Sequence, residues 1–114
     1  DEYAPDVVAH CARVGAELGA DVVKVNYPGS AESFAHVVAC AGVPVVIAGG
    51  AKMDSTRDFL DIVRISLDAG GSGLSVGRNV FQHSDPTRLV EVLNRIVHED
   101  APVDEAVKGY EDIL

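Results

Sequence analysis

The chain has 114 residues, a formal net charge of −9 and a mean hydropathy of +0.15, which suits one small domain with a buried core. The excess of 18 acidic over nine basic residues excludes the basic face that a nucleic-acid-binding protein needs, and the two cysteines lack metal-ligand spacing. The apolar runs are too short to cross a bilayer and no secretory signal pattern is present, so we expect a soluble, cytoplasmic protein.

Helical and extended patterns alternate along the chain, beginning with a helix. Residues 6–18 have helical periodicity, and Gly19 is a natural C-terminal cap. The apolar face of this helix would carry Val8, Cys11, Ala12, Gly15 and Leu18. Residues 21–26 (DVVKVN) predict a strand, and Ser30 is placed to cap a second helix. Residues 43–48 (VPVVIA) form a continuous apolar run, which predicts a strand covered by helices.

The second half of the chain repeats this alternation. Ser55-Thr-Arg-Asp58 resembles a capping box that opens a helix, and residues 73–76 (GLSV) predict a third, short strand. Asp85-Pro86 has the preferred order for the start of a helix, and residues 104–113 predict a final amphipathic helix. Alternating strands and helices indicate βαβ units and a parallel sheet. Three strands would leave two open edges, so we expect further strands to precede Asp1.

The carboxyl ends of the predicted strands hold the candidate catalytic groups, because active sites of parallel α/β folds form there. Lys24 and Lys52 both lie in such segments, although the chain has only three lysines against six arginines. Lys24 stands among three valines (residues 22, 23 and 25), and an apolar setting would lower its pKa and favour the neutral amine. A neutral amine attacks a carbonyl to form an iminium, an electron sink for C–C bond chemistry. The alternative is a lysine that pairs with a carboxylate or extends into solvent.

Two glycine-containing segments at the later strand ends are candidates for binding a phosphate. The pair Gly49-Gly50 lets backbone N–H groups approach an anion, and Gly77-Arg78 adds a planar, permanently charged donor. Lys52 would either assist at the phosphate or face solvent. The alternative is that the glycines only form tight turns and Arg78 pairs locally.

Three motifs together resemble the archaeal-type class I (DeoC-like) aldolase family: GADVVKVNYPGS (19–30), PVVIAGGAK (44–52) and SGLSVGRNVFQ (72–82). The resemblance implies an α/β fold in which this chain is the C-terminal half, about strands six to eight with their helices, of a single (β/α)₈ barrel domain. It implies that Lys24 is the Schiff-base lysine on strand six. It also implies that Gly49-Gly50 and Gly77-Arg78 hold the substrate phosphate after strands seven and eight. A phosphorylated small-molecule substrate, no cofactor, no metal and a homo-oligomer are expected on the same grounds.

The chain departs from the family pattern at two loop positions. Pro28 stands where the family commonly has Thr, and Ala51 stands where it commonly has Pro. The family's strand-one aspartate and its proton-transferring tyrosine would lie upstream of Asp1. Tyr27 follows the lysine in its motif and is not a substitute for that tyrosine.

The segments 81–83 and 96–106 most resemble one branch of the family, 2-amino-3,7-dideoxy-D-threo-hept-6-ulosonate synthase. That enzyme condenses a ketose-phosphate-derived fragment with L-aspartate semialdehyde in an archaeal route to aromatic amino acids. Fructose-1,6-bisphosphate aldolase is the first alternative, and a non-catalytic, phosphate-binding half barrel is the second. The acidic, lysine-poor composition further suggests a halophilic cytoplasm, where salt screens excess charge.

Overall fold

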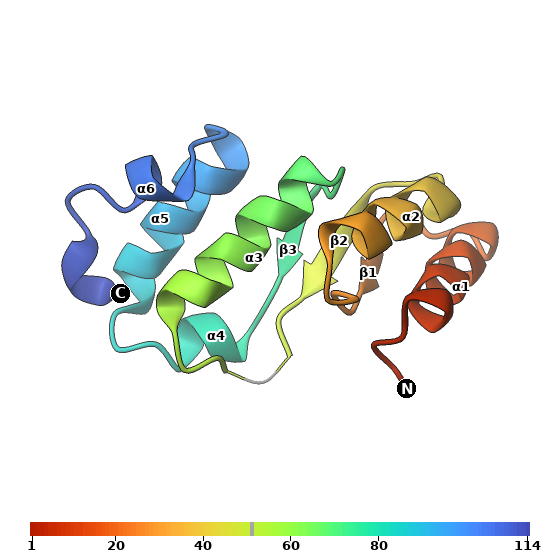
Figure 1. Ribbon diagram of the computed structural model, residues 1–114, viewed down its shortest axis with the longest axis horizontal. Coiled ribbons are helices and arrows are strands. Elements are labelled where there is room, and N and C mark those ends of the chain that lie inside the picture. The colour runs from red at the N-terminus through yellow and green to blue at the C-terminus, as the bar shows by residue number, and fades with distance from the viewer. Residues whose placement is uncertain (51) are drawn as a thin grey trace. The chain divides into compact units, whose positions relative to one another are not determined.

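The computed structural model describes residues 1–50 and 52–114, and its elements are labelled in Figure 1. The departure expected at Ala51 lies outside the described residues. The chain divides into two compact units. Residues 1–48 and 65–75 form the sheet unit, and residues 49–64 and 76–114 form the helical unit. Within the described residues no helix is both long and apolar enough to cross a membrane.

The sheet unit is built on three parallel strands. These are β1 (Val23–Val25), β2 (Val45–Ala48) and β3 (Gly73–Ser75), arranged in the order β1-β2-β3. Val23 pairs with Val45, and Ile47 pairs with Leu74. The predicted strands and their parallel arrangement are therefore confirmed.

Helices α1 (Pro5–Glu17) and α2 (Ala31–Ala41) pack against each other beside this sheet (Figure 1). A Cβ added to Gly15 of α1 would lie 3.0 Å from Val23 Cγ1, so the helix backbone rests directly on β1. A Cβ added to Gly71, before β3, would lie 2.8 Å from Cε2 of Phe34 on α2. The core of this unit is thus formed between the helices and one face of the strands.

Local signals determine where the helices begin. The hydroxyl of Ser30 accepts a hydrogen bond from the Ser33 amide at 3.1 Å, as the sequence predicts for a cap of α2. Ser55 accepts in the same way from the amide of Asp58 at 3.1 Å, at the start of α3 (Thr56–Asp68). The carboxylate of Asp85 accepts from the Arg88 amide at 3.2 Å. All three predicted caps are confirmed.

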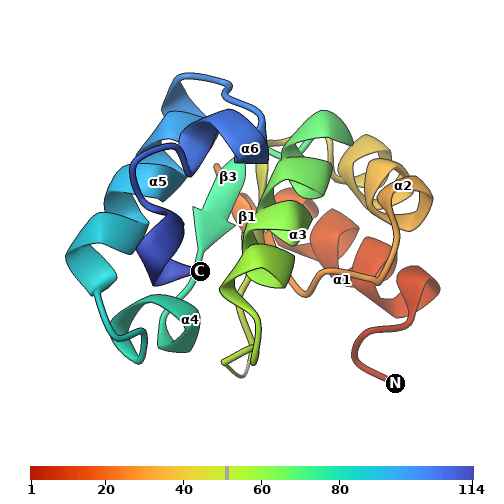
Figure 2. The same cartoon turned by 60° about the vertical axis from the view of Figure 1, so that its left-hand side comes forward.

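The helical unit contains the first turns of α3 and the remaining elements of the chain. These are α4 (Arg78–Phe81), α5 (Pro86–His98), α6 (Val103–Ala106) and the 3₁₀ helix η1 (Glu111–Ile113). Apolar side chains of α3, α5 and the C-terminal segment are buried here, among them Leu60, Leu89, Ile96 and Ile113. Figure 2 shows α6 beside α5. The single tail helix predicted over 104–113 is wrong: the chain turns at Gly109, whose φ of 84° is left-handed.

Polar side chains attach the C-terminal segment to α5. The ring of Tyr110 lies 5.0 Å from the Arg88 guanidinium and 4.5 Å from that of Arg95. Arg95 also donates to two carbonyl oxygens of the segment, each at 3.0 Å. Buried His83 accepts from the Asp85 amide at Nδ1, so the proton lies on Nε2, which donates to the Ile113 carbonyl at 2.9 Å.

The predicted inward face of the first helix is only partly right. Val8 and Ala12 are buried, but Cys11 is exposed and 84% of the Leu18 side chain surface is accessible. The third buried residue of α1 is Ala9. The contacts with α2 and β1 therefore use a face rotated from the one that periodicity indicates, and Leu18 lies beyond the last helical turn.

Candidate active site

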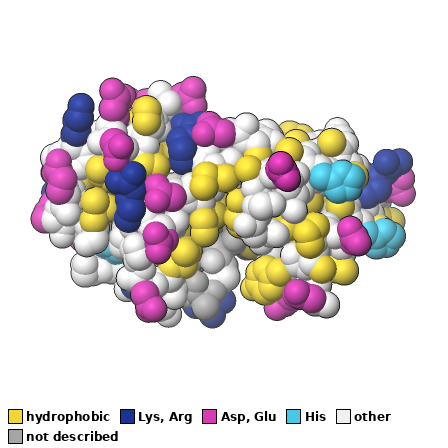
Figure 3. All heavy atoms as spheres, viewed as in Figure 1, with side chains coloured by type: hydrophobic (Ala, Val, Ile, Leu, Met, Phe, Trp, Pro, Cys, Tyr) yellow, Lys and Arg dark blue, Asp and Glu magenta, His cyan; other side chains and the backbone are white. Residues whose placement is uncertain are grey.

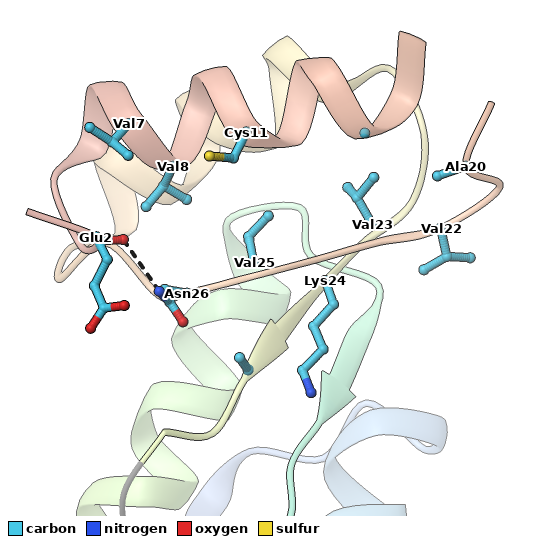
Figure 4. Close-up of a pocket in the computed structure, with 12 residues that line it drawn as sticks. Glu2, Val7, Val8, Cys11, Ala20, Val22, Val23, Lys24, Val25 and Asn26 are labelled. Carbon is cyan, nitrogen blue, oxygen red and sulfur yellow. Dashed lines mark hydrogen bonds between the residues drawn. The ribbon is translucent and has the colours of Figure 1, made fainter. Parts of the chain in front are cut away.

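Lys24 is the middle residue of β1, and its side chain lies on the opposite face of the strand from the buried core. Val23 and Val25 are 6% and 7% exposed, whereas Lys24 is exposed. Figure 4 shows Lys24 pointing away from α1 while the two flanking valines point toward it. The alternation of side chains along a strand produces this arrangement.

The removal of water expected around Lys24 in a barrel mouth stays a prediction, because the described residues form three strands of one sheet. The lysine is exposed, and Val22, one of the three apolar neighbours, is 52% exposed. The valines on either side of a strand residue point to the other face, so they cannot shield it. The sequence pattern correctly identified a lysine set within an apolar strand, and the strand by itself leaves this lysine exposed.

A hollow of about 570 Å³ follows the outer edge of β1. Lys24, Asn26 and Ala48 line it from the sheet, and Cys11 lines it from α1 (Figure 4). The side-chain amide of Asn26 donates to the Glu2 carbonyl at 3.3 Å at one end of this hollow. Among the described residues, β1 has a strand neighbour on one side only. Lys24 borders this hollow, and its exposed side chain extends from the face of β1 that points away from α1.

Tyr27 packs as a structural side chain close to this strand. Its ring centroid lies 5.8 Å from that of Phe34, at a tilt of 48°. Burial raises the pKa of the Tyr27 phenol above its usual value of 10.0. The phenol therefore stays protonated at neutral pH. Its packing against Phe34 indicates a structural role, in agreement with the expectation that Tyr27 does not replace the family's proton-transferring tyrosine.

The predicted glycine pair lies in the helical unit, directly after β2, and both positions require glycine. Gly50 has a φ of 66°, in the left-handed region that side chains disfavour. Gly49 is required for space, because a Cβ there would lie 2.7 Å from Cγ1 and 2.8 Å from Cβ of Val76. The backbone at Gly49 therefore lies against the segment that leads into Gly77 and Arg78.

Asn79 is a residue to which the sequence assigned no role, and it joins these two segments. Its side chain is 4% exposed. Its Oδ1 accepts from the Met53 amide at 2.7 Å, and its Nδ2 donates to the Gly49 carbonyl at 3.1 Å. The two segments predicted to bind phosphate are thus neighbours in the helical unit. The contribution of Asn79 is visible only in the structure, because its two hydrogen-bond partners lie 26 and 30 residues away in the chain.

Arg78 differs from the other five arginines of the chain. Arg13, Arg57, Arg64, Arg88 and Arg95 all donate to carboxylates or to backbone carbonyls. For Arg78, which is exposed, the structure records no ion pair within residues 1–50 and 52–114, so the alternative of local pairing gains no support. Lys52 is exposed on the neighbouring loop. The helical unit therefore presents two cations beside a glycine-rich backbone, an arrangement suited to an anion.

No metal-binding cluster is evident in the described part of the chain, where no three His, Cys, Asp or Glu side chains lie close enough to share an ion. Acidic side chains are spread over the face drawn in Figure 3. These side chains contribute to the net charge of −9.

A family model described as "DeoC/LacD family aldolase" matches residues 1–83. The chain is 48% identical over 103 residues to a class 1 fructose-bisphosphate aldolase of Halobacterium salinarum, covering 90% of this chain and 39% of that protein. It thus spans about two fifths of the length of this relative.

Solved structures give the same result. A Schiff-base-forming fructose-1,6-bisphosphate aldolase aligns with a TM-score of 0.82 and 43% identity, covering 85% of this chain and 39% of the other. A fructose-bisphosphate aldolase from Slackia heliotrinireducens aligns over 100% of this chain and 40% of its own, with a TM-score of 0.87 and 36% identity. The predicted fold class, part of an aldolase-type α/β barrel with parallel strands, is therefore confirmed.

Proposed function

The chain belongs to the DeoC/LacD family of aldolases, and on that premise we propose that it carries the covalent, substrate-binding part of a class I aldolase. Lys24 is the proposed nucleophile. The observation that carries this proposal is the position of Lys24, the middle residue of a parallel strand, whose exposed side chain extends from the face opposite α1. One structurally similar enzyme is described as Schiff-base-forming, which supports a lysine-dependent reaction.

In the proposed reaction the neutral Nζ of Lys24 attacks the carbonyl carbon of a ketose. The carbinolamine loses water to give an iminium; the β-hydroxyl then loses its proton, and the iminium accepts the electron pair released when the Cα–Cβ bond breaks. The products are an aldehyde and an enamine, and protonation and hydrolysis of the enamine release the second product and the free lysine. We assign the proton transfers to groups in the part of the aldolase barrel that this chain does not span.

The proposed phosphate site consists of Gly49, Gly50, Gly77 and Arg78, with Lys52 as a second cation. The required glycines at 49 and 50 support this assignment, as does exposed Arg78, for which no ion pair is recorded among the described residues. A guanidinium that lacks a protein carboxylate partner is available for two parallel hydrogen bonds to phosphate oxygens. The non-catalytic half barrel would retain this site but would leave the lysine at β1 without a role.

We propose fructose 1,6-bisphosphate as the substrate. The named relatives are fructose-bisphosphate aldolases, so they favour this activity over the heptulosonate synthase suggested by residues 81–83 and 96–106. The similarity to a Halobacterium protein agrees with the acidic composition. We further propose that the chain forms the C-terminal part of a single barrel domain and that the whole protein is a homo-oligomer.

Borohydride trapping tests the nucleophile. The full polypeptide is incubated with fructose 1,6-bisphosphate, reduced and mapped by peptide mass spectrometry. We expect a stable adduct on Lys24, its loss in Lys24→Arg and its retention in the matched variant Lys52→Arg. No adduct, or an adduct on Lys52, would contradict the proposal. Comparing glyceraldehyde 3-phosphate with L-aspartate semialdehyde as acceptors separates the aldolase from the synthase.

A further inference from the structure

Asn79 uses both ends of its amide to hold a single loop of the helical unit. Its oxygen binds the amide of Met53 at 2.7 Å, and its nitrogen binds the carbonyl of Gly49 at 3.1 Å. These two residues lie on either side of Gly50 and Lys52 in the segment between β2 and α3. One buried side chain therefore binds the backbone on both sides of these two residues.

The same residue is the chain neighbour of Arg78. Since Asn79 is 4% exposed and Arg78 is exposed, the two side chains leave the first turn of α4 in different directions. Fixing Asn79 to the loop therefore fixes the backbone from which Arg78 extends. The contact between Gly49 and Val76 holds the two segments close, but only the amide bonds specify their register.

No other short side chain meets this requirement as well as asparagine. The Met53 amide can only donate and the Gly49 carbonyl can only accept, so the bridging group needs one acceptor and one donor, and this requirement fixes the amide orientation. Aspartate would place a second acceptor against the Gly49 carbonyl. Alanine would leave two backbone groups without their partner.

We propose that Asn79 is a positioning residue for phosphate binding, which holds the Gly49-Gly50 loop and Arg78 at the separation that a phosphate group needs. The inference rests on the proposed phosphate site. Asn79 does not contact the substrate in this role, because both polar atoms of its amide bind protein backbone. Its effect appears in the affinity for the phosphorylated substrate and not in the covalent step at Lys24.

Asn79→Asp is the informative variant, and exposed Asn94 on α5 offers a matched control, Asn94→Asp. At pH 8 we expect Asn79→Asp to raise the KM for fructose 1,6-bisphosphate about 10- to 100-fold, in line with the loss of a buried hydrogen bond. The KM for unphosphorylated fructose should change less than twofold. Lowering the pH to 5 should restore much of the affinity relative to wild type at the same pH, because a protonated carboxyl can donate to the Gly49 carbonyl.

The failure of this inference is distinguishable from failure of the proposed function. If wild type forms the Lys24 adduct but Asn79→Asp has an unchanged KM, or loses affinity equally for both sugars without recovery at pH 5, the positioning role is wrong. If wild type forms no adduct on Lys24, the proposed function is wrong. Because Asn79→Asp could also disturb the local fold, inorganic phosphate is added to both proteins, and slower amide exchange at Gly50, Lys52 and Met53 is expected in wild type but not in the variant at pH 8. Equal slowing in both proteins would contradict the inference, whereas no slowing in wild type would contradict the proposed phosphate site.

Discussion

Replacing Gly49 by alanine tests whether the glycine loop is held by close packing. The added Cβ would lie 2.7 Å from Val76 Cγ1 and 2.8 Å from Val76 Cβ, and the second atom is not the end of a flexible side chain. Ordinary contacts begin at 3.4 Å, so the valine or the loop must move by about 0.7 Å. The backbone at Gly49 does not have a left-handed φ, so alanine meets no conformational barrier of its own.

Gly77→Ala is the control for the loss of stability expected in Gly49→Ala. Its Cβ would lie 2.8 Å from Cε1 of Phe81, but that ring is 65% exposed and free to rotate away. Both alanines restrict the unfolded chain equally, which favours folding by about 0.4–1 kcal/mol in each variant. The difference between the variants therefore isolates the overpacking at Gly49, for which we expect about 1–3 kcal/mol of lost stability.

Urea unfolding of the two variants and of wild type measures this difference. Adding Val76→Ala to Gly49→Ala should recover part of the loss, because it removes Cγ1 and leaves Cβ. Equal stabilities of Gly49→Ala and Gly77→Ala, or additive effects of Gly49→Ala and Val76→Ala, would refute the close-packing argument.

Two further predictions concern charged groups. Arg78→Ala should raise the KM for fructose 1,6-bisphosphate about 10- to 100-fold, and Lys52→Ala should raise it less, because only the guanidinium offers two parallel donors. Steady-state kinetics measure both values. An unchanged KM in Arg78→Ala would mean that the phosphate binds elsewhere. The hydrogen bond from Arg88 lowers the pKa of Asp112 below 3.8, so its contribution to stability is full above that value and is lost as the pH falls through the folded-state pKa. We expect the free energy of unfolding, measured as a function of pH, to fall less steeply below about pH 4 in Asp112→Asn than in the exposed control Asp6→Asn. Identical pH profiles in the two variants would contradict the stabilising role of the Arg88–Asp112 pair.

The sequence predicted those parts of the fold that depend on neighbouring residues. Helix caps at Ser30, Ser55 and Asp85 involve amides three residues away, so the local pattern is sufficient to identify them. The strands were recognisable because short apolar runs suit strands that helices cover. The same reasoning failed in the tail, where a left-handed residue at Gly109 interrupts an otherwise helical pattern.

The candidate site was predictable in its residues but not in its environment. Lys24 was identified from its place in an apolar strand, where it is the middle residue. Its exposure depends on which segments cover that face of the sheet, and its valine neighbours do not carry this information. Asn79 was missed because its partners are 26 and 30 residues away. Motif resemblance identified the aldolase family, whereas the segments 81–83 and 96–106 pointed to a synthase that the named relatives do not favour.

The way in which the C-terminal segment is attached to α5 has a consequence for ionic strength. Salt shortens the range of attraction between exposed charges to about 3 Å at 1 M, which removes attractions between charges that are not in contact. The two guanidiniums stacked on Tyr110, and the hydrogen bonds of Arg95 to backbone carbonyls, act over contact distances and involve no carboxylate. We therefore expect this attachment to depend less on salt concentration than one held by attraction between separated charges.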